Sequence, residues 1–118
     1  MATLEQQRAA DTWQCAGGRN TDFVNLAKSL PALIMNSGLM QVTAFLREKM
    51  GVHEQLNAQL RRWLRQRFPG TFATDDFATF MNALQQADPQ TFQAITAEAF
   101  AWLRWLRQMA GARVNGGN

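Results

Sequence analysis

The chain has 118 residues, a length that fits one domain with one hydrophobic core. Apolar residues make up 47% and charged residues 18%, a globular composition that excludes a disordered chain. One Cys and one His exclude an intrachain disulfide and a multi-Cys zinc site. The net charge of +3 is only a weak indication of a polyanionic partner.

Residue usage favours helices over strands. There are 18 Ala and 12 Leu against 4 Val and 2 Ile, with no Tyr and 3 Pro. We therefore predict an all-α fold, a single compact bundle of about six helices over residues 1–118, with a flexible tail from about 112. A compact chain of this length would have a radius of gyration near ~13 Å.

The first two predicted helices have clear boundaries. Thr3 and Gln6 have the spacing of a capping box, and the first helix should end at Gly17-Gly18. The second should begin after Thr21 or Asp22, which are good N-caps, and run toward residue 35. Pro31 should kink or split it at residue 30.

The next two predicted helices cover residues 38–50 and 52–67. Gly38 is expected to permit a tight corner because glycine tolerates a positive φ. One face of the later helix is apolar, and it should stop at 68–70, Phe-Pro-Gly. The fifth helix should start near Thr74 or Asp75 and end near residue 87.

The sixth predicted helix runs from Pro89 to about Ala110. Asp88 is its expected N-cap, Pro89 suits the first helical position, and Gly111 should end it. The longest charge-free segment, 29–46, contains Pro31 and polar residues, so it predicts two buried helix pieces rather than a membrane span. No signal peptide is visible, and a cytoplasmic soluble protein is expected.

Candidate catalytic groups are few. His53 lies on the same face as Leu56 and Leu60, which is typical of a histidine at the edge of a core. Cys15 has no His or Lys near it in sequence and should be an inert thiol. The pair Asp75-Asp76 is better explained as helix caps than as a catalytic dyad. We expect no enzyme activity, no metal site, no cofactor and no small-molecule substrate.

Arginines concentrate in the fourth predicted helix. A helical wheel places Arg61, Arg62 and Arg65 on one side, opposite the apolar face, so we expect a stripe open to solvent. Arg67 should snorkel from the apolar arc at the helix end. The stripe is either an ordinary solvated face or a phosphate-binding surface.

The last helix carries two tryptophans. Trp102 falls on its apolar face and Trp105 lies at or beyond the edge of that face. An edge tryptophan packs under a loop, anchors a protein interface or stacks on a base. Five methionines at helical spacing are expected to fill the core: Met35, Met40, Met50, Met81 and Met109.

Three blocks of sequence resemble the Cmr small-subunit family, the small α-helical subunit of type III-B CRISPR RNA-targeting effector complexes. The blocks are Thr3-Leu-Glu-Gln-Gln-Arg8, the segment from Leu26 to Lys49 with Asn36-Ser37-Gly38-Leu39 and Ala44-Phe45-Leu46, and the segment from Thr96 to Ala110 with Glu98-Ala99. They occur in the family's order and cover about half of the chain. Ser37 stands where the family usually has Asn, and the segment between the third and fourth helices is short.

The resemblance implies a subunit that is not the nuclease. Several copies would stack head to tail beside the guide-RNA-bearing backbone subunits, with the large subunit at one end, and would help hold target RNA paired to guide RNA. The candidate RNA contacts are Arg8, Lys28, Lys49 and Arg107 from the matching blocks, and Arg47, Arg61, Arg62 and Arg65 from the charge pattern. The candidate subunit-interface residues are Trp102 and Trp105.

Two other hypotheses remain open. One is a stand-alone helical adaptor that binds a protein through Trp102 and Trp105 and has no RNA role. The other is a small helix-turn-helix DNA-binding regulator, which ranks last because no partner helix with the required turn is evident.

Overall fold

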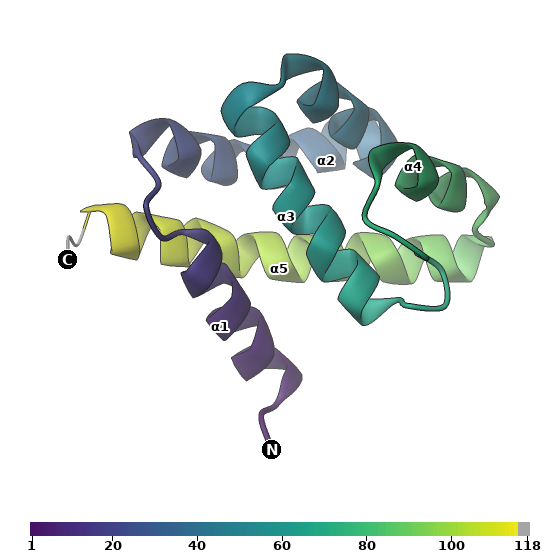
Figure 1. The fold of residues 1–118 in the computed structure, drawn as a ribbon, viewed down its shortest axis with the longest axis horizontal. Helices are drawn as coiled ribbons and strands as arrows, with labels where there is room; N and C mark the ends of the chain where they lie inside the picture. The colour runs from purple at the N-terminus through teal and green to yellow at the C-terminus, as the bar shows by residue number, and fades with distance from the viewer. Residues whose placement is uncertain (116–118) are drawn as a thin grey trace.

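The structure, a computed structural model, describes residues 1–115, which form five α-helices and no strand. The helices are α1 (Leu4–Cys15), α2 (Thr21–Lys49), α3 (Gly51–Arg67), α4 (Phe77–Gln86) and α5 (Pro89–Asn115). In Figure 1, α5 crosses the molecule as one long helix, α1 and α3 lie in front of it, and α4 lies near its N-terminal half. The all-α class is confirmed, and the radius of gyration of 13.7 Å agrees with the expected value.

The start of α1 has the predicted capping box. Thr3 Oγ1 accepts from Gln6 N at 3.1 Å, and Gln6 Oε1 accepts from Thr3 N at 2.8 Å. The helix ends at Cys15, and Gly18 follows with a positive φ of 71°. The cap of α2 is Asn20, whose side chain accepts from the backbone of residue 23, so the predicted caps lie one or two residues too late.

The predicted split of the helix at Pro31 is wrong, since α2 continues through it, and the alternative of a kink there stays a prediction. Leu30 and Ile34, on either side of Pro31, are fully buried, and their packing holds the helix against the local preference of proline. The helix breaks instead at Gly38, with φ 83° and ψ 160°. The predicted glycine corner is confirmed. The structure has five helices where six were predicted, because the second and third predicted helices, on either side of Gly38, together form α2.

By length and mean hydropathy, α2 could cross a membrane. The same test is passed by core helices of soluble proteins, and Gly38 divides α2 into two pieces that are each shorter than the ~20 residues a span needs. Both pieces also bury side chains in the core, among them Phe23 and Leu46. We therefore read α2 as two core helices.

The caps of the last two helices follow the sequence closely. Asp76 caps α4 by accepting from Thr79 N at 3.1 Å, so α4 begins slightly later than predicted. Asp88 accepts from Thr91 N at 2.8 Å and caps α5 at Pro89, as predicted. These contacts lower the pKa of the Asp76 and Asp88 carboxyls, chiefly through the backbone hydrogen bond each accepts, and confirm the predicted capping role for Asp76 of the Asp75-Asp76 pair.

The predicted end of the last helix at Gly111 is wrong. Residues 112–115 continue the helix, while 116–118, the rest of the predicted tail, lie outside the described residues. Arg113 donates to Trp13 O at 2.8 Å and stacks on the Trp13 ring at 4.8 Å, and Val114 packs against the core. These contacts offset the low helix propensity of glycine.

One hydrophobic core joins residues from all five helices. The predicted apolar faces of the fourth and sixth helices are buried as expected, including Leu60, Leu64 and Leu103. Two methionines are exceptions to the predicted core role. Met35 is 79% exposed before the Gly38 corner, and Met50 is 51% exposed at the break between α2 and α3.

Candidate nucleic-acid interface

Arg61 is buried, so the predicted solvent-open arginine stripe is wrong at its centre. Its side chain is 7% exposed and pairs with Glu54, two helical turns earlier, at 2.8 Å. Its Nε donates to Asp75 O at 2.9 Å, which ties the loop before α4 to α3. Arg61 therefore holds the fold together.

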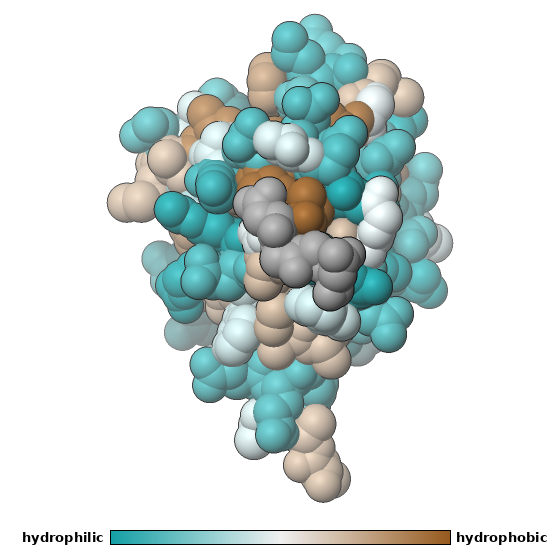
Figure 2. All heavy atoms as spheres, turned by 90° about the vertical axis from the view of Figure 1, so that its left-hand side faces the viewer, coloured by the Kyte–Doolittle hydropathy of each residue, from teal (hydrophilic) through white to brown (hydrophobic). Residues whose placement is uncertain are grey.

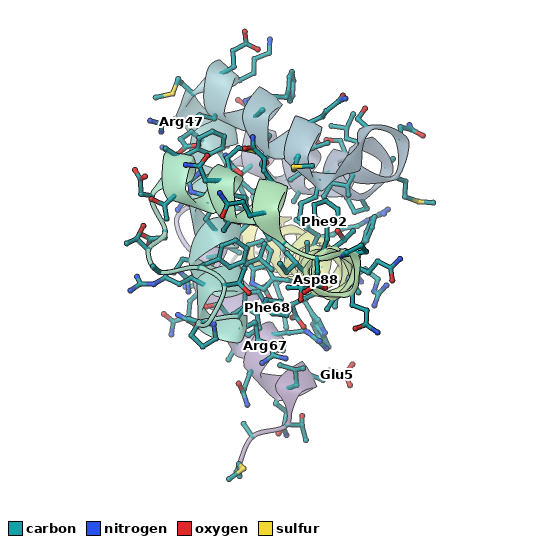
Figure 3. The ribbon with its side chains drawn as sticks, turned by 90° about the vertical axis from the view of Figure 1, so that its right-hand side faces the viewer. Glu5, Arg47, Arg67, Phe68, Asp88 and Phe92 are labelled. Atoms are coloured by element: carbon teal, nitrogen blue, oxygen red, sulfur yellow. The ribbon has the colours of Figure 1, made fainter. Side chains whose placement is uncertain are left out.

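Glu54 also forms an ion pair with Arg47 at 3.0 Å. The guanidinium groups of Arg47 and Arg61 lie over the Phe77 ring, at 5.9 Å and 5.5 Å from its centre. Burial raises the pKa of Glu54, but hydrogen bonds from Arg61 and Asn57 outweigh it, so the pKa lies below its ordinary value. Figure 3 shows Arg47 beside the first turn of α4. This cluster fixes α4 against α2 and α3.

Arg62 joins α3 to α1. It donates to both carboxylate oxygens of Asp11, at 2.9 Å and 3.1 Å, and to Cys15 Sγ at 3.2 Å. The hydrogen bond to Asp11 raises the pKa of the guanidinium. Burial and the Asp11 charge raise the pKa of the Cys15 thiol to about 11, which agrees with the predicted inert thiol.

Arg8 joins α1 to α5 through Glu98. The contact is bidentate, at 2.8 Å and 2.7 Å, and Trp63 Nε1 donates to the same carboxylate at 2.9 Å. Arg67 approaches Glu98 at 3.5 Å from the end of α3, where Figure 3 places it. Burial raises the pKa of Glu98, but the hydrogen bonds from Arg8 and Trp63 lower it by more than burial raises it. The pKa of Glu98 therefore lies below its ordinary value.

Trp102 cannot contact a second subunit, because it is 0% exposed within the folded chain. Its Nε1 donates to Asp11 Oδ2 at 2.8 Å, which accounts for the buried N–H. Trp105 is partly exposed on α5, and its interface role stays a prediction. Trp13, on α1, is 44% exposed. It was not identified from the sequence as a surface aromatic, because α1 has no apolar stripe against which its position could be judged.

The structure leaves a second set of cations exposed and, among residues 1–115, without an acidic partner within 4.0 Å. Lys28, Lys49, Arg65 and Arg107 of the predicted set belong to it. Arg104 is a further member that sequence reasoning missed, although its spacing of three residues from Arg107 places both on one side of α5. Figure 2 shows that hydrophilic side chains cover most of the face at the C-terminal end of α5.

These free cations do not form one tight cluster. They come from the first part of α2, its last turn, the last turn of α3 and the second half of α5. Lys49 lies over the Phe45 ring at 5.7 Å, and Phe45 is 40% exposed, so a cation and an aromatic surface are adjacent there. Such a distribution suits contacts to an extended polyanion at several points.

His53 and the possible metal-binding side chains are the remaining candidates from the sequence. His53 is half-buried and meets the Phe45 ring edge to face at 6.0 Å. Within the part of the chain that the structure describes, no three His, Cys, Asp or Glu side chains gather into a possible metal site.

The fold and these charges define a small all-helical protein with an internally neutralised arginine set and a separate exposed set. The chain belongs to the CRISPR-associated protein family described as Cas_Cmr5, whose family profile matches residues 4–113. It is thus a CRISPR-associated Cmr subunit, and the resemblance seen in the sequence is confirmed. A search of curated proteins gives no match.

Proposed function

We propose that this chain is the non-catalytic small subunit of a cytoplasmic type III-B CRISPR ribonucleoprotein effector complex. Several copies stack as an inner filament beside the backbone and large subunits and help hold target RNA paired to guide RNA. The observation that carries the proposal is the family match over nearly the whole chain. The chain needs no cofactor in this role.

Exposed cations support an RNA-holding role. Base pairing between guide and target already reads the sequence, so the protein needs only to recognise shape and phosphate charge. Lysine and arginine contacts to phosphates are independent of sequence and weaken with salt. Each copy offers few such contacts, and stacked copies along one RNA would add them by avidity.

The proposed contacts are the five exposed cations that have no acidic partner within residues 1–115: Lys28, Lys49, Arg65, Arg104 and Arg107. Arg47 is 47% exposed and lies at the margin of this set, since it also pairs with Glu54. Arg8, Arg61 and Arg62 are assigned to the fold, because a phosphate would have to displace their carboxylate partners.

The test compares Lys28→Ala/Lys49→Ala with Arg104→Ala/Arg107→Ala in reconstituted complexes, using two unrelated guides and several salt concentrations. Each true phosphate contact removed should lower the slope of log affinity against log salt by about 0.7–0.9 per copy engaged. The loss should be equal for both guides. Gln108→Ala is the matched control, since it is an exposed α5 side chain without charge.

Three outcomes count against the proposal. Unchanged target binding in both double variants would favour the protein adaptor, with Trp105 as its remaining exposed candidate. A loss confined to one guide would indicate base readout. RNA cleavage by the purified chain that disappears with His53→Ala would show that the subunit is catalytic.

A further inference from the structure

Arg19 is a cation that the RNA proposal does not use. It lies in the connection between α1 and α2 and reaches α3. Its Nε donates to Cys15 O at 3.1 Å, its Nη1 donates to Gln55 Oε1 at 2.9 Å, and its Cζ lies over the Phe23 ring at 5.2 Å from the centre. Arg19 is half-buried, so these contacts hold the guanidinium in one orientation instead of leaving it free in solvent.

The charge of Arg19 is not neutralised within the described chain. No carboxylate of residues 1–115 lies within 4.0 Å of it, whereas Arg8, Arg61 and Arg62 each pair with one. A guanidinium has five N–H donors, and Arg19 uses two of them on neutral oxygens. The other three N–H groups have no protein acceptor among these residues, so they are available to a ligand.

A pocket of about 230 Å³ opens at this guanidinium. Gln55 and Phe23, which contact the guanidinium from two sides, both line the pocket, so the guanidinium forms part of its wall. The lining contains one cation and no acidic side chain. It consists of Gly18, Arg19, Asn20, Phe23, Val52 and Gln55.

The two amides of this lining also present donors. Asn20 Oδ1 accepts from Phe23 N at 3.2 Å, and Gln55 Oε1 accepts from Arg19. A backbone N–H and a guanidinium can only donate, so each amide must turn its oxygen toward them. The NH2 groups of Asn20 and Gln55 remain without an acceptor among the described residues. The side chains therefore offer the pocket N–H donors around a fixed positive charge, which is the chemistry that recognises an oxyanion.

We propose that this pocket binds one phosphate group of the RNA backbone. Arg19 is the charged donor, and Asn20 and Gln55 are neutral donors. Capping of α1 accounts only for the Cys15 contact of Arg19, and leaves its contacts with α2 and α3 without a purpose. The source of the phosphate rests on the proposed RNA role, while the anion site itself follows from the donors. Inorganic phosphate alone should bind with a dissociation constant on the order of 1–10 mM.

Nuclear magnetic resonance of the full chain tests the site. Inorganic phosphate and a short oligouridine are each titrated at constant ionic strength, with chloride as the reference anion. Both should move the Arg19 Nε–H signal and the Gln55 side-chain NH2 signals until they saturate. Oligouridine should do so at lower concentration, because its other phosphates can reach the exposed cations. Arg19→Gln should raise the dissociation constant for phosphate, followed at Gln55, by more than about tenfold.

Two matched variants control for charge. Arg65→Gln removes the same charge from an exposed position of α3 outside the pocket and should leave phosphate binding unchanged. Arg19→Lys keeps the charge but loses the planar fork, so phosphate binding should weaken several-fold. The same spectra show that each variant is folded.

Three results overturn the proposal. If phosphate moves neither signal to saturation, Arg19 only caps α1. If Arg19→Gln and Arg65→Gln weaken phosphate binding equally, the attraction is a general effect of charge. If phosphate moves the signals and oligouridine does not, the pocket takes a free anion and not RNA.

Reconstituted complexes separate this proposal from the RNA role. Arg19→Gln should lower target affinity equally for two unrelated guides. If Arg19→Gln has no effect while the variants of the exposed cations lower affinity, the pocket proposal fails and the RNA role stands. If phosphate saturates the pocket but every cation variant binds target RNA normally, the RNA role fails, and the assignment of the phosphate to RNA fails with it.

Discussion

Trp102 donates its indole N–H to Asp11 at 2.8 Å and so joins the last helix to the first. Trp63 makes the equivalent bond to Glu98 at 2.9 Å. Each carboxylate also receives a bidentate guanidinium from another helix. The two carboxylates are therefore polar junctions that join α1, α3 and α5 to one another.

The Asp11 junction should contribute measurably to stability. Asp11→Ala removes the acceptor of both Arg62 and Trp102 and leaves the buried Trp102 N–H unpaired, so the free energy of unfolding should fall by about 2–3 kcal/mol. Urea denaturation measures this loss. Glu48→Ala removes an exposed carboxylate without such partners and should change stability by less than about 0.5 kcal/mol. Equal effects of the two variants would contradict a structural role for Asp11.

The Glu98 junction predicts loss of stability in acid. The folded-state pKa of Glu98 lies below its ordinary value of 4.5, so its contribution is complete above about pH 4.5 and is lost as the pH falls through the folded value. Glu98→Gln removes this contribution at neutral pH. The difference in unfolding free energy between wild type and Glu98→Gln should shrink steadily below pH 4.5. A difference that is constant from pH 7 to pH 3 would refute the prediction.

Two glycines should respond to the same substitution with opposite signs. Gly38→Ala places a Cβ in open space but at φ 83° and ψ 160°, a region nearly restricted to glycine, and should cost about 1–3 kcal/mol. Gly111→Ala lies within α5, also in open space, and should stabilise by about 0.5–1 kcal/mol. Thermal unfolding of both variants tests the assignment. A neutral Gly38→Ala would mean that the corner has another conformation.

The thiol of Cys15 should resist alkylation in the folded protein. Burial raises its pKa to about 11 from the ordinary 9.0, so the reactive thiolate is scarce at pH 8. Iodoacetamide should therefore modify Cys15 slowly in buffer and rapidly in urea. The raised pKa also means that its contribution to stability is present below pH 9 and declines as the pH rises toward 11. Equal labelling rates with and without urea would disprove the burial.

Local signals in the sequence predicted much of the fold. Thr3 with Gln6, Asp88 before Pro89, and Gly38 all act through groups within a few residues of themselves, and the structure places each as expected. Pro31 and Gly111 were misjudged because tertiary packing holds the helix through both positions. Helix boundaries set by contacts far along the chain are not visible in a local pattern.

The candidate site was harder to predict for the same reason. A helical wheel of 61–67 shows no acidic residue, but Arg62 meets Asp11 from 51 positions away. Arg8 likewise meets Glu98 from 90 positions away. The partner of Arg61, Glu54, lies on the same helix two turns earlier, so that pair could have been found by extending the wheel. Charge counting finds cations, but only the tertiary structure shows which of them are free.

The bonds that hold α1 have a consequence for synthesis of the chain. Asp11 and Arg8 are made early, but their partners on α5, Trp102 and Glu98, follow 91 and 90 residues later. During translation, the face of α1 that packs on α5 therefore stays uncovered until almost the whole chain has been made. Completion of this fold is thus a late event, and a nascent chain that stalls before residue 98 has the Arg62 contact to Asp11 but neither of the contacts that join α1 to α5.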